Sequence, residues 1–381
     1  MTNSIPERAS WGQTLKRAAK PLIAIVVILG IGQSVRLAWL DLHSTHVRTE
    51  RRLMSLNEQL TTASNDEQKA IHREILTIEN SQFQLKHVRW KTAGIAILFA
   101  ILGLVPPAVF WWLTLRSFGH SVPIVAAQAV FAAGNLGKYV PGKAMVLILR
   151  SSAMQRFGVP ISTSIVSTFI ETLTSLAVGG ALGAMTLSAL NPPHWLLGMA
   201  IGVAAISLAP TIPALFRIIL EFLTRYRHLR IPKKLPLAMN WRLVGSGWCL
   251  FFLAWLLMGT SLWVLCESIR DSMTIESSLV STPSVSSLRL WWISISAACL
   301  GFVIGFLSML PGGAGVREVV VTMLLAPAIG YAPALAAAVL YRIANLIAEL
   351  MMAGFAGLLA KRSARHETRD LLGNAKWNSI D

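Results

Sequence analysis

The feature that most constrains this chain is a series of apolar runs, each long enough to cross a lipid bilayer. These runs are residues 21–40, 92–115, 161–189, 195–216, 243–265 and 334–360. A transmembrane helix needs about 20 consecutive apolar residues. Only 14% of the 381 residues are charged, whereas soluble domains carry about 25%. The sequence therefore predicts an all-α polytopic membrane protein, with about seven or eight transmembrane helices in total.

The lysines and arginines behind the net charge of +16 gather in short stretches beside the apolar runs. The linker 217–242 holds seven of them against one acid, and the segments 1–20 and 361–381 are also basic. Cytoplasmic segments of membrane proteins carry this excess. We therefore expect a multi-pass protein of the plasma (inner) membrane with both termini in the cytoplasm. The charge is explained without any binding of nucleic acid.

The polar segment 41–91 separates the first apolar run from the second. Run 21–40 is long for a signal peptide and lacks a clear cleavage site, so we interpret it as an uncleaved anchor. Within 41–91, apolar residues recur at helical spacing in two stretches, and Ser64 followed by Glu67 matches a capping box. The pattern predicts an extracytoplasmic antiparallel helical hairpin. We favour a packed spacer, and a coiled coil that binds a partner protein is the alternative.

Two further apolar regions, 121–150 and 289–330, are broken by proline and glycine. If linker 217–242 is cytoplasmic, each region must begin and end on one side of the membrane. About 30 residues are few for two spans and a turn, so 121–150 fits a re-entrant hairpin. Region 289–330 fits either a re-entrant hairpin or two short spans. Both have a Pro-Gly break before a basic residue, which predicts an inverted repeat, an arrangement typical of transporters.

Candidate site residues cluster at the first break, which reads LGKYVPGK. Non-helical backbone at membrane depth is tolerated where protein or a watery cavity surrounds it. A helix that starts near Lys143 would direct free N–H groups toward an anion such as a lipid phosphate. We predict that Lys138, Tyr139, Gly142 and Lys143 bind substrate. The alternative is that both lysines extend to a cytoplasmic interface.

The second break, PGGAGVRE, supplies the other half of the predicted site. Gly312 and Gly313 allow a tight turn and a close approach of backbone. Arg317 has the geometry to bind a phosphate with two N–H groups, and Glu318 lies at the same helix start. The alternative is an Arg317–Glu318 pair that only stabilises the loop.

Ionisable residues inside the spans complete the set of candidates. Glu171, Arg342 and Glu349 fall within apolar runs, where charge is costly and usually functional. Arg150 lies near a span end, and we expect its side chain to reach the interface. The three cysteines are widely spaced and no metal-binding motif is present, so we expect no metal or cofactor.

The segments NLGKYVPGK, LPGGAGVRE and LYRIANLIAEL resemble the flippase-like transmembrane family, named after the membrane part of lysylphosphatidylglycerol synthase/flippase. The resemblance covers roughly residues 92–360. It implies re-entrant helices from both sides with a lipid cavity between them. The matching residues are Lys138, Tyr139, Pro141, Gly142 and Lys143 in the first motif, and Pro311, Gly312, Gly313, Gly315, Arg317 and Glu318 in the second.

In that family, full-length proteins flip aminoacylated phosphatidylglycerol, which a soluble C-terminal domain makes from aminoacyl-tRNA. This chain ends at Asp381, so we expect a stand-alone member without the synthase domain. Its substrate is then open among anionic phospholipids and polyprenyl-linked lipids.

Three classes of function follow from these observations. We expect a transporter, not an enzyme, that moves an anionic lipid between leaflets. The alternatives are a scaffold of a lipid or glycan pathway and, ranked last, an enzyme acting on lipid phosphates. The enzyme is ranked last because the sequence shows no evident group of residues for general acid/base catalysis. The sequence leaves homo-oligomerisation open.

Overall fold

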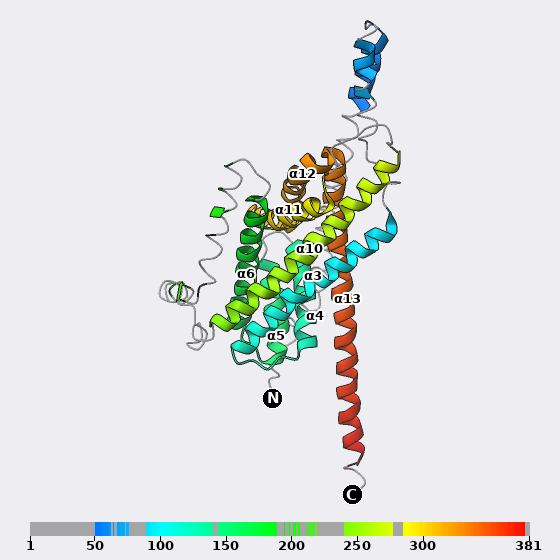
Figure 1. Ribbon diagram of the computed structural model, residues 1–381. Coiled ribbons are helices and arrows are strands. Elements are labelled where there is room, and N and C mark those ends of the chain that lie inside the picture. Colours follow the sequence, from blue (N-terminus) through cyan, green and yellow to red (C-terminus); the bar gives the residue numbers. More distant parts are fainter. Residues whose placement is uncertain are drawn as a thin grey trace, which may run out of the picture.

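The computed structural model describes residues 89–139, 144–188, 240–276 and 285–377, most of 50–75, and isolated positions between 194 and 218 (Figure 1). Within these ranges the chain is helical and contains no strand. Six helices in them are long and apolar enough to cross a membrane, which confirms the all-α polytopic class. They are α3 (Trp90–Ser117), α6 (Ile161–Ser188), α10 (Trp241–Glu276), α11 (Ser287–Leu307), α12 (Val316–Ile329, together with the turn before it) and α13 (Tyr331–Trp377).

The expected anchor 21–40 lies outside the described residues, as does most of the expected span 195–216. Two helices are longer than the sequence suggested. Helix α10 continues to Glu276, past the end of the expected span 243–265, and α13 continues through the basic tail to Trp377.

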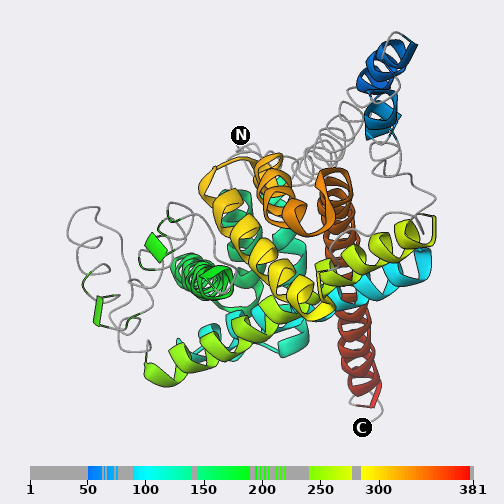
Figure 2. The same cartoon turned by 45° about the horizontal axis from the view of Figure 1, so that its top comes forward.

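Helices α3 and α10 pack along each other across one face of the molecule, as both views show (Figures 1 and 2). In lipid the hydrophobic effect does not drive helices together, and small residues allow the close packing that stabilises their contact. A Cβ atom on Gly247 would lie 2.7 Å from the Phe110 ring, and one on Gly103 would lie 3.0 Å from Met258. Phe110 in turn meets Phe251 edge to face. This seam is one wall around the centre of the fold.

The first broken region forms a short hairpin of α4 (Ile124–Asn135), the 3₁₀ turn η2 (Leu136–Tyr139) and α5 (Ala144–Met154). At about 1.5 Å per residue, α4 and α5 extend about 18 and 16 Å, well short of the roughly 30 Å of a bilayer core. The broken, short hairpin predicted for 121–150 is therefore present. We call it the first hairpin.

The second broken region consists of α11, the 3₁₀ turn η5 (Pro311–Gly313) and α12. We call it the second hairpin. It lies in the upper part of Figure 1, whereas α4 and α5 lie in the lower part. The turns η2 and η5 meet in the middle of the molecule. The two hairpins thus approach each other from opposite ends, which agrees with the predicted inverted arrangement.

The hairpin of residues 50–75, which the sequence predicts to be extramembrane, projects away from the helical body (Figure 2). Residues 50–61 are helical, and an ion pair of 2.9 Å joins Arg52 to Glu74 on the returning arm. Leu56 and Ile75 are buried, and Glu67 accepts a hydrogen bond of 3.0 Å from the Ser64 N–H, as a capping box requires. The described arms are too short for sustained heptads, so a coiled coil is not supported.

Candidate functional site

A cavity of about 210 Å³ lies where the two hairpin turns meet. Its lining comes from both hairpins and from α3, α6, α10 and α13. We call it the central cavity. Seven charged side chains, four positive and three negative, line it: Lys138, Arg150, Glu171, Arg317, Glu318, Arg342 and Glu349. Six of these seven form three ion pairs, and each pair joins different helices.

The first pair ties the turn of the first hairpin to α13. The Lys138 ammonium donates to Oε1 of Glu349, and the Tyr139 hydroxyl donates to Oε2 at 3.1 Å. The Glu349 side chain is only 4% exposed, whereas Lys138 is 29% exposed. Gly137 makes the turn possible, because a Cβ atom there would lie 2.8 Å from the backbone nitrogen of Val146. Lys138 is therefore held in the protein and does not extend to an interface.

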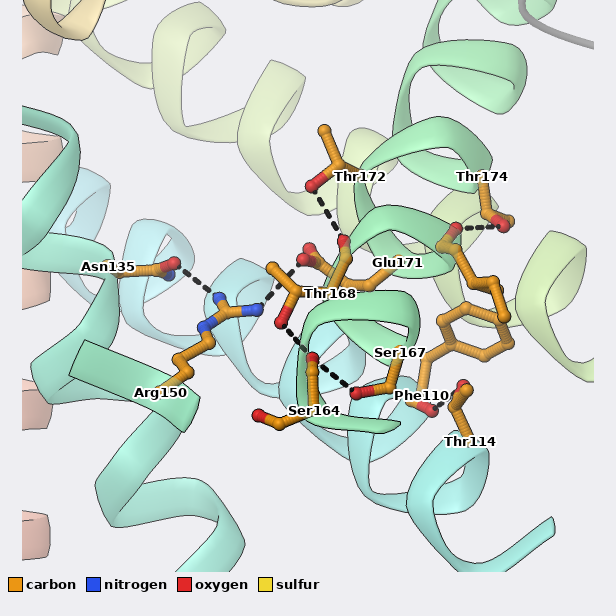
Figure 3. A network of polar contacts seen from close by, with 11 residues as sticks. Phe110, Thr114, Asn135, Arg150, Ser164, Ser167, Thr168, Glu171, Thr172 and Thr174 are labelled. Carbon is orange, nitrogen blue, oxygen red and sulfur yellow. Dashed lines mark hydrogen bonds and ion pairs between the residues drawn. The ribbon is translucent and has the colours of Figure 1, made fainter. Parts of the chain in front are cut away.

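The second pair is the buried contact between Arg150 of α5 and Glu171 of α6 (Figure 3). Nη1 of Arg150 donates to Glu171 at 3.0 Å, and Nη2 donates to the Asn135 side chain at 2.7 Å. The guanidinium also lies 4.1 Å from the centre of the Phe131 ring. The Arg150 side chain is 1% exposed, so the expectation that it reaches the interface is wrong. Its charge is neutralised inside the fold, which removes the need to reach water.

Hydroxyl groups surround Glu171 along α6, as Figure 3 shows. The hydroxyls of Ser167 and Thr168 both donate to the Ser164 carbonyl at 2.9 Å, and Thr172 donates to the Thr168 carbonyl. A serine or threonine in a membrane helix commonly satisfies its hydroxyl in this way. These three hydroxyls are thus satisfied within α6, whereas those of Thr163 and Ser164 are buried without a partner among the described residues.

The third pair links the second hairpin to α13. Arg342 donates to Oε1 of Glu318, which lies in the first turn of α12, where the helix dipole favours a carboxylate. Oε2 of Glu318 and Nη2 of Arg342 are buried without a hydrogen-bond partner among the described residues. Glu318 thus pairs with Arg342 and not with its neighbour Arg317, so the loop-stabilising alternative is wrong.

Arg317 is the seventh ionisable residue, and it forms no ion pair with the residues that the structure describes. Its guanidinium lies 5.2 Å from the centre of the Phe302 ring, in the range of a cation–π contact. A Cβ atom on Gly305 would overlap its side chain, and one on Gly313 would lie 2.9 Å from its Cδ. Two glycines therefore make room for Arg317 at the cavity wall.

The turn before Arg317 requires glycine at three positions. Gly312, Gly313 and Gly315 have φ angles of 58°, 68° and 81°, in the region that residues with a Cβ atom rarely adopt. A Cβ atom on Gly312 would lie 3.3 Å from the Tyr139 ring and 3.4 Å from Nη2 of Arg342. The glycines thus let the second hairpin turn reach both the first hairpin and α13.

The sequence-based candidates come together with three exceptions. Gly313 packs against the Arg317 side chain but does not line the central cavity. Lys138, Tyr139, Gly312, Arg317, Glu318, Glu171, Arg342 and Glu349 all line the central cavity. Gly142 and Lys143 lie outside the described residues. Sequence reasoning missed Arg150 as a cavity residue and did not consider Asn135. An arginine at the end of the apolar stretch AMVLILR was the available signal for the first.

Comparison with known proteins gives a family but no individual relative. The model of the family described as "Lysylphosphatidylglycerol synthase TM region" matches residues 79–352, and this range includes every described residue of the central cavity. No curated protein matches the chain significantly.

Proposed function

We propose a lipid-transport function for this chain, which belongs to the family of the lysylphosphatidylglycerol synthase transmembrane region. Family membership makes it a multi-pass membrane protein of lipid-related pathways. The transport step is our inference: an anionic headgroup enters the central cavity and leaves toward the other leaflet.

The observation that carries this proposal is Arg317. Its guanidinium lines a membrane-embedded cavity and has no carboxylate partner among the described residues. An unpaired charge inside a membrane is costly and is usually retained for function. A guanidinium binds a phosphate with two parallel N–H groups, which makes a lipid phosphate a suitable ligand.

The size of the cavity also supports a headgroup and not a whole lipid. Pockets for drug-sized ligands measure about 300–1,000 Å³, and this cavity measures about 210 Å³. The acyl or prenyl chains would remain among the apolar outer faces of the helices. Exposed Leu98, Leu102 and Val105 on α3 provide one such face.

A leaflet assay tests the proposal. Purified protein is placed in liposomes with fluorescent headgroup-labelled anionic phospholipids or polyprenyl phosphates, and a membrane-impermeant reagent quenches the outer leaflet. We expect protein-dependent movement that falls at least about tenfold in Arg317→Gln, because one strong electrostatic contact is lost. Arg289→Gln, at an exposed position on α11, removes the same charge away from the cavity and is the matched control.

A transporter releases its lipid chemically unchanged. Mass spectrometry of the recovered lipid separates transport from an enzymatic reaction. If the mass of the lipid changes only when the protein is present, the protein is an enzyme and the transport proposal is wrong.

We also propose that the protein lies in the plasma (inner) membrane with both termini cytoplasmic. The basic linker 217–242 and the basic tail support this orientation. In Figure 1 the end of α13 and the extramembrane hairpin lie at opposite ends of the molecule, as the orientation requires. Labelling of single cysteines at residues 58 and 370 from each side of the membrane tests it.

A scaffold is the second candidate, because the hairpin of residues 50–75 extends from the body and offers exposed polar arms. Deletion of residues 50–75 distinguishes the two functions. Loss of cellular function with lipid movement intact would favour the scaffold.

A further inference from the structure

The charges around the central cavity do not balance. Four cationic and three carboxylate side chains line it, so one positive charge is in excess among the described residues. The three pairs are Lys138–Glu349, Arg150–Glu171 and Arg342–Glu318. A proton that moves within a pair leaves the pair neutral in sum. The excess charge is therefore that of Arg317, which stays protonated in proteins.

The surroundings of Arg317 keep this excess in the cavity. Its side chain is confined between Gly305 and Gly313, and the Phe302 ring covers one face of the guanidinium. Beside it, Nη2 of Arg342 and Oε2 of Glu318 are buried without a partner among the described residues. A headgroup that brings one negative charge would balance the charge of Arg317.

We propose that the central cavity selects lipids whose headgroup carries one net negative charge. The inference rests on the transport function proposed above and narrows its substrate class to singly charged phosphate esters. A zwitterionic headgroup leaves Arg317 unbalanced. A doubly charged headgroup adds an unbalanced negative charge, and either imbalance is costly at low dielectric.

Equilibrium binding to the purified full chain tests this selection without requiring transport. Three short-chain lipids with identical tails serve as probes at pH 8. They are phosphatidylcholine with no net charge, phosphatidylglycerol with one negative charge and phosphatidic acid with close to two. We expect phosphatidylglycerol to bind the wild type at least about tenfold more tightly than either of the others.

Three variants change the excess charge in a defined way. Arg317→Gln lowers it to zero and should remove the preference for phosphatidylglycerol. Glu349→Gln raises it to two and should move the preference to phosphatidic acid. The double variant Arg317→Gln/Glu349→Gln restores an excess of one and should restore the original preference. If the double variant stays without a preference, charge balance is not the rule and the proposal is overturned.

Matched controls separate charge selection from damage to the fold. Arg289→Gln and Glu58→Gln make the same changes at exposed positions and should keep the wild-type preference. If Glu349→Gln does not fold, Glu318→Gln raises the excess at a different position and tests the same prediction. Thermal melting of every variant identifies which ones retain the fold.

The outcomes for the wild type distinguish this inference from the proposed function. Binding of all three lipids with equal affinity overturns the charge selection and leaves lipid transport standing. Binding of none of them counts against both. Inorganic phosphate at pH 5, a single negative charge without a lipid tail, is the last probe. Competition by it at the concentration of the lipid would assign the site to a soluble anion and overturn the lipid assignment.

Discussion

The two broken hairpins differ in how they treat their cations. In the first hairpin, Lys138 and Arg150 are both bound by carboxylates from other helices. In the second, Arg317 has an aromatic ring and glycines beside it and no carboxylate partner among the described residues, while its neighbour Glu318 binds Arg342 of α13. The described cations of the first hairpin are thus neutralised within the protein, and the second holds one charge that we propose is available for a ligand. We call the first hairpin, with its paired cations, the closed side and the second hairpin, with Arg317, the open side.

The largest expected effect is on the closed side. We expect Arg150→Met to lower the free energy of unfolding by about 3–5 kcal/mol, because it leaves the buried Glu171 carboxylate unpaired. Unfolding in denaturant, followed by tryptophan fluorescence in detergent, measures the loss. Adding Glu171→Gln should recover a large part of the stability, since no buried charge then remains. An Arg150→Met protein as stable as the wild type would mean that the Arg150–Glu171 pair does not stabilise the first hairpin.

The turn of the first hairpin should also be sensitive to a single methyl group. In Gly137→Ala the new Cβ atom would meet backbone atoms of Met145 and Val146 at 2.9 and 2.8 Å, which cannot move aside alone. We expect a loss of about 1–3 kcal/mol in the free energy of unfolding. Gly94→Ala is the control, because nothing lies within 4 Å of its Cβ position. Equal stability of the two variants would contradict the tight packing of the turn.

On the open side, we expect function to fall while the fold persists. Gly305→Ala places a methyl group against the Arg317 side chain, which is flexible and can move away from its position. Lipid movement in the leaflet assay should fall by about tenfold, which corresponds to about 1.4 kcal/mol, with a smaller change in melting temperature than in Gly137→Ala. If the melting temperature falls further in Gly305→Ala than in Gly137→Ala, the contrast between the hairpins is wrong.

The smallest effect concerns a carboxylate outside the membrane. Like Glu318, Glu67 lies in the first turn of a helix, but its partner is Ser64 and it is exposed. The Ser64 backbone and side-chain hydrogen bonds lower the pKa of Glu67 below its ordinary value of 4.5. The contribution to stability is therefore complete above pH 4.5 and is lost as the pH falls through the lower, folded pKa.

Amide hydrogen exchange at Ser64 measures this contribution. Protection should decrease on acidification in the wild type, and Glu67→Gln should show a weaker dependence on pH. Glu58→Gln on the other arm is the control. A wild-type profile without any pH dependence would show that the Ser64–Glu67 contact does not stabilise the hairpin.

Much of this architecture was predictable because it depends on local patterns. Apolar length predicted the membrane helices, since backbone polar groups in lipid must be satisfied within a helix. The glycines before Arg317 predicted a turn, because only glycine readily adopts the positive φ angles found there. The alternation of basic segments predicted that each broken region returns to its own side of the membrane, and this stays a prediction. The structure shows the two hairpins at opposite ends of the molecule.

The partners of the charges were not predictable from local patterns. Arg317 and Glu318 are adjacent, so the sequence left a pair between them open, yet successive positions on a helix point in different directions. Arg150 lies near a helix end, where an exposed position is ordinary, and the packing of α5 against α4 and α6 encloses it.

The sequence by itself determined the membrane class, the two breaks and six of the seven charged residues that line the central cavity. The tertiary structure alone decided which of those charges are neutralised, because ion pairing depends on distances between helices that lie far apart in the chain. Lys138 and Glu349 are separated by 211 positions and still form a pair, whereas Arg317 does not pair with the adjacent Glu318. That one difference in pairing is the reason we propose the second hairpin as the binding site of a lipid headgroup.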